Sequence, residues 1–526
     1  MILRYSQPIL ISIIVLPGLL VNTKDVSFPA VILFQASKEH IFRHIVIDFY
    51  TQIEDNTSIR PVFLLPARKI VPPESWPGWI TNTGGTQMKK WIAVLLILVM
   101  TLSTAACGAS QPAATETAGT VGTEAPPTEY LPYEGETLTV LSLSGEYADA
   151  ARMIAPEFEA VTGAKVEVVD YPYETLHEQA LLDLTSYIGT YDVINMDSRW
   201  DGEFAVYLEP LDDYVARDKY DMSVWIENVL ANCGQWQDTL IGMPTSCAPN
   251  VFAYRTDLLP DGIPDTWQEY RRVLTSVNRP YEGTYGATVC RDDAQMGSLF
   301  NCVLWSMGGS WADEEWNVTI SSLETRTALG HMYAMKNLYD PAGAQWTAEE
   351  SIQAFLEGKA AVCETWPNWE LLQKADDPAQ SEIVGKWALD VIPHDKTGST
   401  LMSAWDIAIS AASRNKDLAW EWIKMYTSYD CQNRFYDDFG IFSPRKAFWN
   451  QEKVSDLSAV REALDTANTV WRIPASIEAE ANIGPIVNAY VSSQIYQETA
   501  VSRMKTALET ALENAPPEEG TRNSNH

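Results

Sequence analysis

The fold is decided by residues 137–200, which read TLTVLSLSGEYADAARMIAPEFEAVTGAKVEVVDYPYETLHEQALLDLTSYIGTYDVINMDSRW. Three apolar runs in this stretch predict buried strands, at 137–143, 165–169 and 192–196. The segments between them predict helices, at 148–161 and 174–187. Strands that alternate with helices are typical of an open α/β sheet with parallel strands.

The loops that follow these strands are candidate binding positions, because ligands of open α/β sheets lie beyond the carboxyl ends of the strands. One loop holds Ser144 and Glu146, and the other holds Asp197 and Trp200. We therefore expect these four side chains near a ligand.

The rest of the chain is richer in helices. Apolar periodicity predicts helices at 266–274, 324–338, 348–357, 416–426 and 502–514. Strand-like segments lie among them at 240–243, 250–254, 387–392 and 406–410. We expect a disordered tail at 516–526.

The chain has 526 residues, with 37 Lys and Arg against 70 Asp and Glu, for a net charge of −33. That length predicts several domains or one large two-lobed fold. The acidic balance argues against a nucleic-acid ligand, since affinity for phosphate backbones comes mostly from Lys and Arg. Residues 107–526 hold 28 basic and 64 acidic side chains, a net charge of −36, so the character of the chain changes near residue 107.

Residues 88–106 predict an export signal that ends just before Cys107. Met88 and two lysines precede an apolar run at 91–101, and small residues lead up to the cysteine. The Thr-Ala-Ala-Cys ending resembles a bacterial lipobox, which predicts lipidation of Cys107. The alternative is a plain secretory signal with a chance cysteine. We interpret residues 1–87 as an upstream over-read without a function of their own.

Residues 107–136 predict a disordered tether, because they are rich in Ala, Thr, Gly, Pro and Glu and poor in core-forming side chains. Six further cysteines permit three disulfides, with Cys233/Cys247 and Cys290/Cys302 as local pairs, or they are buried free thiols. No Cys or His spacing indicates a metal, and we expect no cofactor.

Short motifs from about 137 to 515 occur in the order found in one known family. They are TGAKV at 162–166, YDV at 191–193, LEPLDD at 208–213, IGMP at 241–244, AYRTD at 253–257, PDTW at 264–267, FLEGKAA at 355–361, IP at 392–393, KDLAWEWI at 416–423 and SPR at 443–445. Together they resemble the family 1 extracellular solute-binding proteins of bacterial ABC sugar importers, the group that contains maltose-binding protein.

The resemblance implies a two-lobed α/β fold of the periplasmic-binding-protein type II, with discontinuous lobes joined by hinge strands. One lobe comprises 137–247 with 393–445, and the other comprises 248–392 with 446–515. It further implies a monomer that closes on a carbohydrate and delivers it to the transmembrane permease and its ATPase. Cys107 would anchor the exported chain to the outer face of the cytoplasmic membrane.

Sixteen tryptophans follow residue 106, and aromatic rings stack on the apolar faces of sugars. Further ligand-binding candidates lie in segments expected to face the cleft: Trp366, Trp369, Trp405, Asp406 and Arg291. Trp405 stands where the family commonly has small residues, which predicts either stacking on the ligand or a reshaped pocket.

Three other function classes are alternatives to a sugar carrier. A polyamine or another small solute would suit the acidic balance, and a sugar receptor for a signalling partner would share the fold. A secreted hydrolase is disfavoured, because the chain has no Gly-x-Ser-x-Gly, His-Glu-x-x-His or phosphate-loop motif. We therefore expect no catalytic site.

Overall fold

The computed structural model describes residues 11–12, 30–33, 35–36, 44–47, 131–366, 369–518 and 521–523. The chain divides into two units, Met1–Val121 and Gly122–His526. In the first unit, two short antiparallel pairs are described: β1 (Ile11–Ser12) with β3 (Gln35–Ala36), and β2 (Ala30–Leu33) with β4 (His44–Ile47). The expected signal at 88–106, Cys107 and the tether up to residue 130 lie outside the described residues.

The second unit contains a five-stranded sheet with the order β10-β15-β7-β5-β6. Its strands are β5 (Thr137–Leu143), β6 (Lys165–Tyr171), β7 (Val193–Asp197), β10 (Gly242–Pro249) and β15 (Met402–Ile409). The parallel arrangement of β5, β6 and β7 confirms the α/β prediction, whereas β15 runs antiparallel to both of its neighbours, β7 and β10. We call the part of the unit built on this sheet the first lobe.

Helices cover both faces of this sheet, because successive side chains of a strand point to opposite faces. Leu138 and Val140 of β5 pack with α2 (Glu146–Thr162) and α12 (Lys416–Tyr426), while Leu141 packs with α3 (Tyr173–Ser186). Shorter helices complete the lobe: α4 (Asp201–Phe204), α5 (Asp212–Asp218), α6 (Glu227–Asn232) and α13 (Tyr429–Phe439). A small hairpin of β8 (Gln235–Trp236) and β9 (Thr239–Leu240) precedes β10.

A four-stranded sheet with the order β12-β13-β11-β14 forms the base of the second lobe. Its strands are β11 (Phe252–Arg255), β12 (Tyr285–Thr288), β13 (Ala360–Cys363) and β14 (Trp387–Asp390). The helices of this lobe are α7 (Trp267–Val277), α8 (Asp293–Ser306), α9 (Leu323–Met335), α10 (Ala348–Leu356), α11 (Trp369–Lys374), α14 (Ser458–Ala463), α15 (Ala475–Val491) and α16 (Gln497–Asn514). The expected helices of this lobe are confirmed, whereas α8, α11, α14 and α15 were not predicted from the sequence.

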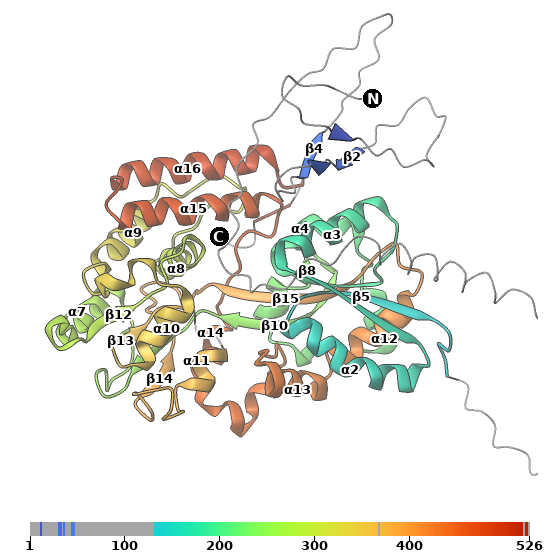
Figure 1. Ribbon diagram of the computed structural model, residues 1–526, viewed down its shortest axis with the longest axis horizontal. Helices are drawn as coiled ribbons and strands as arrows, with labels where there is room; N and C mark the ends of the chain where they lie inside the picture. Colours follow the sequence, from blue (N-terminus) through green and yellow to red (C-terminus); the bar gives the residue numbers. More distant parts are fainter. Residues whose placement is uncertain are drawn as a thin grey trace, which may run out of the picture. The chain divides into compact units, whose positions relative to one another are not determined.

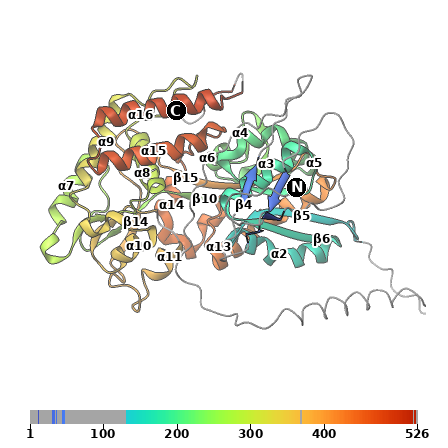
Figure 2. The same ribbon diagram turned by 45° about the horizontal axis from the view of Figure 1, so that its top comes forward.

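Three neighbouring segments lie where the lobes meet: β10 with β11, β15, and the segment between α14 and α15. β10 continues into β11 through Asn250. β15 returns from the second lobe beside β10, as Figures 1 and 2 both show. The Asn250 amide donates to the Leu401 carbonyl at 2.8 Å, and the Met402 amide donates to the carbonyl of Asn468 in the third segment at 2.7 Å. These hydrogen bonds join the three segments into one hinge.

The six cysteines after residue 107 are buried free thiols, so the two expected local disulfides are absent from the described residues. Cys302 shows why burial suits a thiol here, since its sulfur accepts from the Leu401 amide at 3.4 Å inside the core. The alternative of free thiols is therefore correct.

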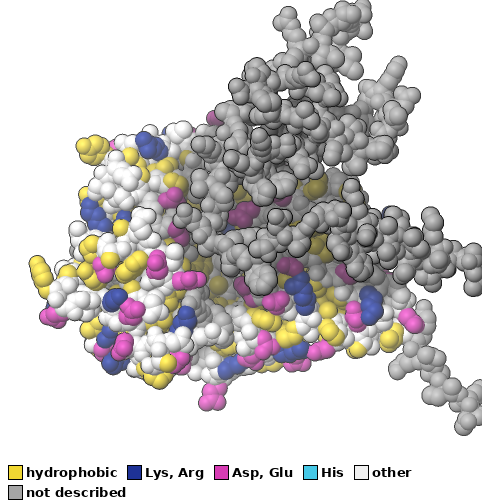
Figure 3. Space-filling view, viewed as in Figure 1, with side chains coloured by type: hydrophobic (Ala, Val, Ile, Leu, Met, Phe, Trp, Pro, Cys, Tyr) yellow, Lys and Arg dark blue, Asp and Glu magenta, His cyan; other side chains and the backbone are white. Residues whose placement is uncertain are grey.

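The C-terminal segment expected to be disordered has described contacts with the second lobe. The Trp316 indole donates to the Thr521 carbonyl at 2.9 Å, and Asn523 is buried against the same loop. Among the residues that the structure describes, no helix combines the length and the apolar character needed to cross a membrane. On the face shown in Figure 3, acidic and basic side chains are interspersed.

Candidate functional site

A cavity of about 620 Å³ lies between the two lobes. The first lobe contributes α3 and the turn after β7, and the second lobe contributes α8 and α15. Its lining consists of Tyr173, Glu174, His177, Glu178, Arg199, Trp200, Asp293, Ala294, Gly297, Ser298, Asn301, Trp311, Ile477, Glu480, Ala481, Ile483 and Pro485. The volume is within the range of roughly 300–1,000 Å³ that small-molecule sites have.

The second-lobe wall exists because α8 and α15 approach each other closely. A Cβ atom on Gly297 would stand 3.3 Å from the Cα of Gly484, and one on Gly484 would stand 1.9 Å from the carbonyl oxygen of Asp293. Real Cβ atoms do not come that close to backbone atoms, so a larger residue at 484 would push the helices apart. Glycine at these positions lets the two helices form one continuous wall.

Aromatic side chains form the first-lobe side of the cavity. Trp200 lines it and lies 5.2 Å from the ring of Tyr173 and 5.8 Å from that of Trp405. Trp405 is itself buried and also packs on Tyr147 at 5.1 Å, so it supports the wall from behind. This arrangement gives a ligand an apolar aromatic face with rigid backing.

Arg199 crosses the space between the lobes. Its guanidinium donates to both carboxylate oxygens of Asp197, at 3.0 and 2.6 Å, and to Glu480 of α15 at 3.0 Å. The Asp197 carboxylate also accepts from the Arg199 amide at 3.0 Å, which fixes the turn that carries the arginine. Burial raises the pKa of Glu480, and the Arg199 charge opposes that rise.

A second, smaller cavity of about 200 Å³ adjoins the first. Its lining consists of Asp197, Ser198, Arg199, Gln295, Ser298, Trp366, Leu401, Met402, Ser403, Val470 and Glu480. The hydroxyl of Ser198 is buried there without a hydrogen-bond partner. A buried polar atom of this kind is a position where a ligand hydroxyl could bind.

The structure brings Trp200, Asp197 and Trp366 of the expected site together at the two cavities. Trp369 begins α11, and its side chain lies outside the described residues.

The other candidates line neither cavity. The Ser144 hydroxyl donates to Asp170 at 2.6 Å, and this bond holds the pKa of the Asp170 carboxyl below its usual range. Glu146 is exposed at the start of α2, and Arg291 donates to Ser492 at 3.3 Å. As ligand contacts, all the sequence candidates stay predictions.

Asp406 lies fully buried on β15, within hydrogen-bond reach of Asp201. The Nε of Arg472 donates to Asp201 at 3.1 Å, while Oδ1 of Asp201 and both carboxyl oxygens of Asp406 have no partner. Gly242 makes room for this group, since a Cβ there would stand 2.9 Å from Oδ2 of Asp406. Burial, reinforced by the nearby Asp201 charge, raises the pKa of Asp406 well above its usual range.

Several cavity residues were not predicted from the sequence. Tyr173 could have been found, because it follows the carboxyl end of a predicted parallel strand. Asn301 lies on α8, Trp311 follows that helix, and Glu480 lies on α15. Neither helix has a clear apolar stripe in its sequence. Ten of the fourteen α8 side chains are buried, so this helix shows no polar face in its sequence.

Comparisons with known proteins agree with this architecture. Residues 144–432 match the family model of the bacterial extracellular solute-binding proteins. A probable amino-acid ABC transporter periplasmic-binding protein of Sinorhizobium fredii is 25% identical over 57% of this chain and 71% of its own length. The mannitol-binding protein of Pseudomonas aeruginosa is 28% identical over 34% of this chain and 43% of its own length.

A solved structure of an ABC transporter solute-binding protein from Agrobacterium radiobacter, in complex with ribitol, matches with a TM-score of 0.59 and 25% identity. The match covers 72% of this chain and 99% of that one. The lobes and the hinge of the present chain therefore have a counterpart in a protein whose ligand is known.

Proposed function

This chain belongs to the bacterial extracellular solute-binding protein family, and we propose that it captures a carbohydrate or polyol between its lobes for an ABC importer. The observation that carries the proposal is the cavity of about 620 Å³ between the lobes, with an aromatic wall and several polar groups. Aromatic faces suit the C–H surfaces of sugars, and carboxylates and amides suit their hydroxyls.

Two of the compared proteins support a polyhydroxylated ligand. One is named for mannitol and the other was solved with ribitol, and both ligands are short polyols. The protein would bind such a solute by closing at the three-segment hinge, since a ligand that contacts both walls favours the closed state. It would then pass the solute, as a monomer, to the transmembrane permease and its ATPase.

An amino acid or a polyamine is the second ligand class. The Sinorhizobium fredii relative is named for amino acids, and the large cavity has four carboxylates in its lining, Glu174, Glu178, Asp293 and Glu480. Among the lining residues of this cavity, Arg199 is the one Lys or Arg. Its charge is already paired with Asp197 and Glu480. A cationic ligand would therefore meet an acidic cavity.

Family membership implies a place outside the cytoplasm, and we propose a lipid anchor at Cys107 for it. The support is the basic start, apolar run and small residues of 88–106 in front of the cysteine. Several acyl chains on one residue give stable anchoring where a single chain does not. Mass spectrometry of the protein extracted from membranes would test this, and an unmodified Cys107 peptide or an intact 88–106 segment would contradict it.

A thermal-shift panel of mannitol, ribitol, maltose, spermidine and the common amino acids tests the ligand class. A ligand at one hundred times its dissociation constant stabilises the folded state by about 2.7 kcal/mol, which gives a measurable rise in melting temperature. We expect a rise with polyols or sugars. A rise with amino acids or spermidine alone would contradict the carbohydrate proposal and favour the second class.

A further inference from the structure

The two cavities between the lobes are separated by a short wall of side chains. Arg199, Ser298 and Glu480 line both cavities, so each of these residues has one side toward the large cavity and one toward the small cavity. The Arg199–Glu480 ion pair, with 3.0 Å between its atoms, closes the wall from lobe to lobe.

Contacts within the first lobe fix the position of Arg199 in this wall. Asp197 binds the guanidinium with two hydrogen bonds in a fork geometry, and the guanidinium lies 5.3 Å from the ring centroid of Tyr173. The Asp197 side chain is only 4% exposed, so moving Arg199 away would leave a buried carboxylate without its partner. The arginine is therefore not free to swing aside for a ligand.

We propose that the Arg199–Glu480 wall sets the length of the saccharide that this protein binds, by confining the ligand to the large cavity. The inference rests on the proposed function. A ligand that fits the cavity of about 620 Å³ makes all its contacts there, whereas a longer chain must enter the cavity of about 200 Å³ through the space that the two side chains occupy. The contact surface of the small cavity is therefore out of reach for a ligand held in the large cavity, because these two side chains stand in between.

Two variants open the wall from opposite lobes. Asp197→Asn combined with Arg199→Ala removes the arginine and the first-lobe carboxylate that binds it. Glu480 then loses its cation, but its side chain is 26% exposed and keeps contact with water. Glu480→Ala shortens the second-lobe half and leaves the Asp197–Arg199 pair intact. We expect the double variant to have the larger effect, because it removes the longer side chain.

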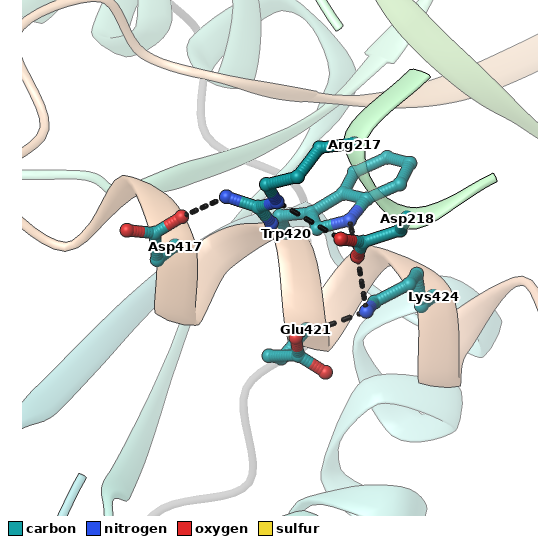
Figure 4. Close-up of polar contacts among 6 residues, drawn as sticks. All are labelled: Arg217, Asp218, Asp417, Trp420, Glu421 and Lys424. Atoms are coloured by element: carbon teal, nitrogen blue, oxygen red, sulfur yellow. Dashed lines mark hydrogen bonds and ion pairs between the residues drawn. The ribbon is translucent and has the colours of Figure 1, made fainter. Parts of the chain in front are cut away.

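Arg217→Ala is the matched control. Arg217 also donates to two carboxylates, Asp218 at 2.9 Å and Asp417 at 2.6 Å (Figure 4). It lines neither cavity. Combined with Asp417→Asn, this control removes one arginine and one carboxylate bound to it, so its net charge is unchanged, as in the double wall variant.

The experiment is isothermal titration calorimetry of the full chain with ribitol, mannitol and linear α-1,4-linked glucose chains of one to six units. For the unaltered protein and the control, affinity should stop rising with length once the large cavity is filled. In the two wall variants the rise should continue for at least one further unit, with a tenfold or greater gain for the longer chains.

The outcomes separate the two proposals. If the unaltered protein binds a polyol or sugar and the wall variants keep its length profile, the wall has no role in length selection and this inference alone is overturned. If the unaltered protein binds none of the panel, the proposed function fails and the inference fails with it.

Discussion

Two arginines join the first lobe to the α15 region of the second, and they differ in their contact with water. Arg199 reaches Glu480 on α15, and its side chain is 32% exposed. Arg472 lies three residues before α15 begins, reaches Asp201 in the first lobe, and is 3% exposed. Water can replace the partner of the exposed arginine but not that of the buried one. The lobes can therefore separate at Arg199 while Arg472 holds them at the hinge.

The two arginines also differ in the state of the carboxyl groups around them. Both carboxylates at Arg199 are hydrogen-bonded to it, whereas Asp406 near Arg472 has two unpartnered oxygens. A proton on Asp406 would let its carboxyl group donate a hydrogen bond to Asp201, so that each of the two carboxyl groups gains a hydrogen-bond partner. The buried pair is thus sensitive to pH.

The largest expected effect comes from removing the buried charge with Arg472→Met. The variant leaves the Asp201 carboxylate buried without its cation, and breaking such a pair costs about 3–5 kcal/mol. Urea unfolding of the full chain measures the loss. Adding Asp201→Asn should restore part of the stability, because it removes the unpaired charge. An equal loss in the single and double variants would mean that the pairing does not determine stability.

The next effect is a dependence of stability on pH. Burial raises the pKa of Asp201 to about 6 and that of Asp406 well above its usual range, so the folded state keeps a proton that the unfolded state has already released. The stability tied to this proton is complete below about pH 4, the ordinary carboxyl pKa, and declines as pH rises through the folded values.

Asp406→Asn should weaken this decline, because the amide cannot ionise and still donates a hydrogen bond. Urea unfolding at pH 5, 6.5 and 8 would show a flatter profile than that of the unaltered protein. Two parallel profiles would mean that Asp406 is ionised in the folded state.

Loss of the Arg199–Glu480 ion pair should change the free energy of unfolding less than loss of Arg472, and should change the separation of the lobes more. Glu480→Gln removes an ion pair whose side chains are 32% and 26% exposed, which costs about 0–1 kcal/mol of folding free energy. The ligand-free protein should then occupy open states more often, and small-angle X-ray scattering should give a larger radius of gyration. Asp417→Asn is the matched control, since it weakens the Arg217 pair without touching the cleft. An equal radius in both variants would mean that the Glu480 contact does not favour closure.

The sequence predicted the parts of the fold that carry strong local patterns. The pattern from 137 to 197 predicted β5, α2, β6, α3 and β7, because the spacing of apolar residues within a segment indicates whether it forms a strand or an amphipathic helix. The antiparallel place of β15 depends on its pairing with β10, and pairing between distant segments leaves no local pattern.

The candidate site was predicted less completely, for the same physical reason. Asp197 and Trp200 were found because they follow a strand end, where open α/β sheets bind ligands. Glu480 was missed because α15 contains Pro485 and mostly small and apolar residues, which hide its helical period. Asp406 was expected at the ligand, yet its strand turns this carboxyl toward Asp201 in the buried interior of the first lobe, and a sequence does not show which side of a buried strand faces a cleft.

The central claim is that the solute binds in the large cavity, and Ala481→Trp tests it most directly. Ala481 is an exposed wall residue of α15, so an indole there would occupy the cavity without disturbing the core. Asn482→Trp places the same side chain at the next, equally exposed residue, which lines neither cavity. Calorimetric titration with the solute that most stabilises the unaltered protein should show binding lost in Ala481→Trp and retained in Asn482→Trp. Equal affinity in both variants would place the ligand elsewhere and contradict the account.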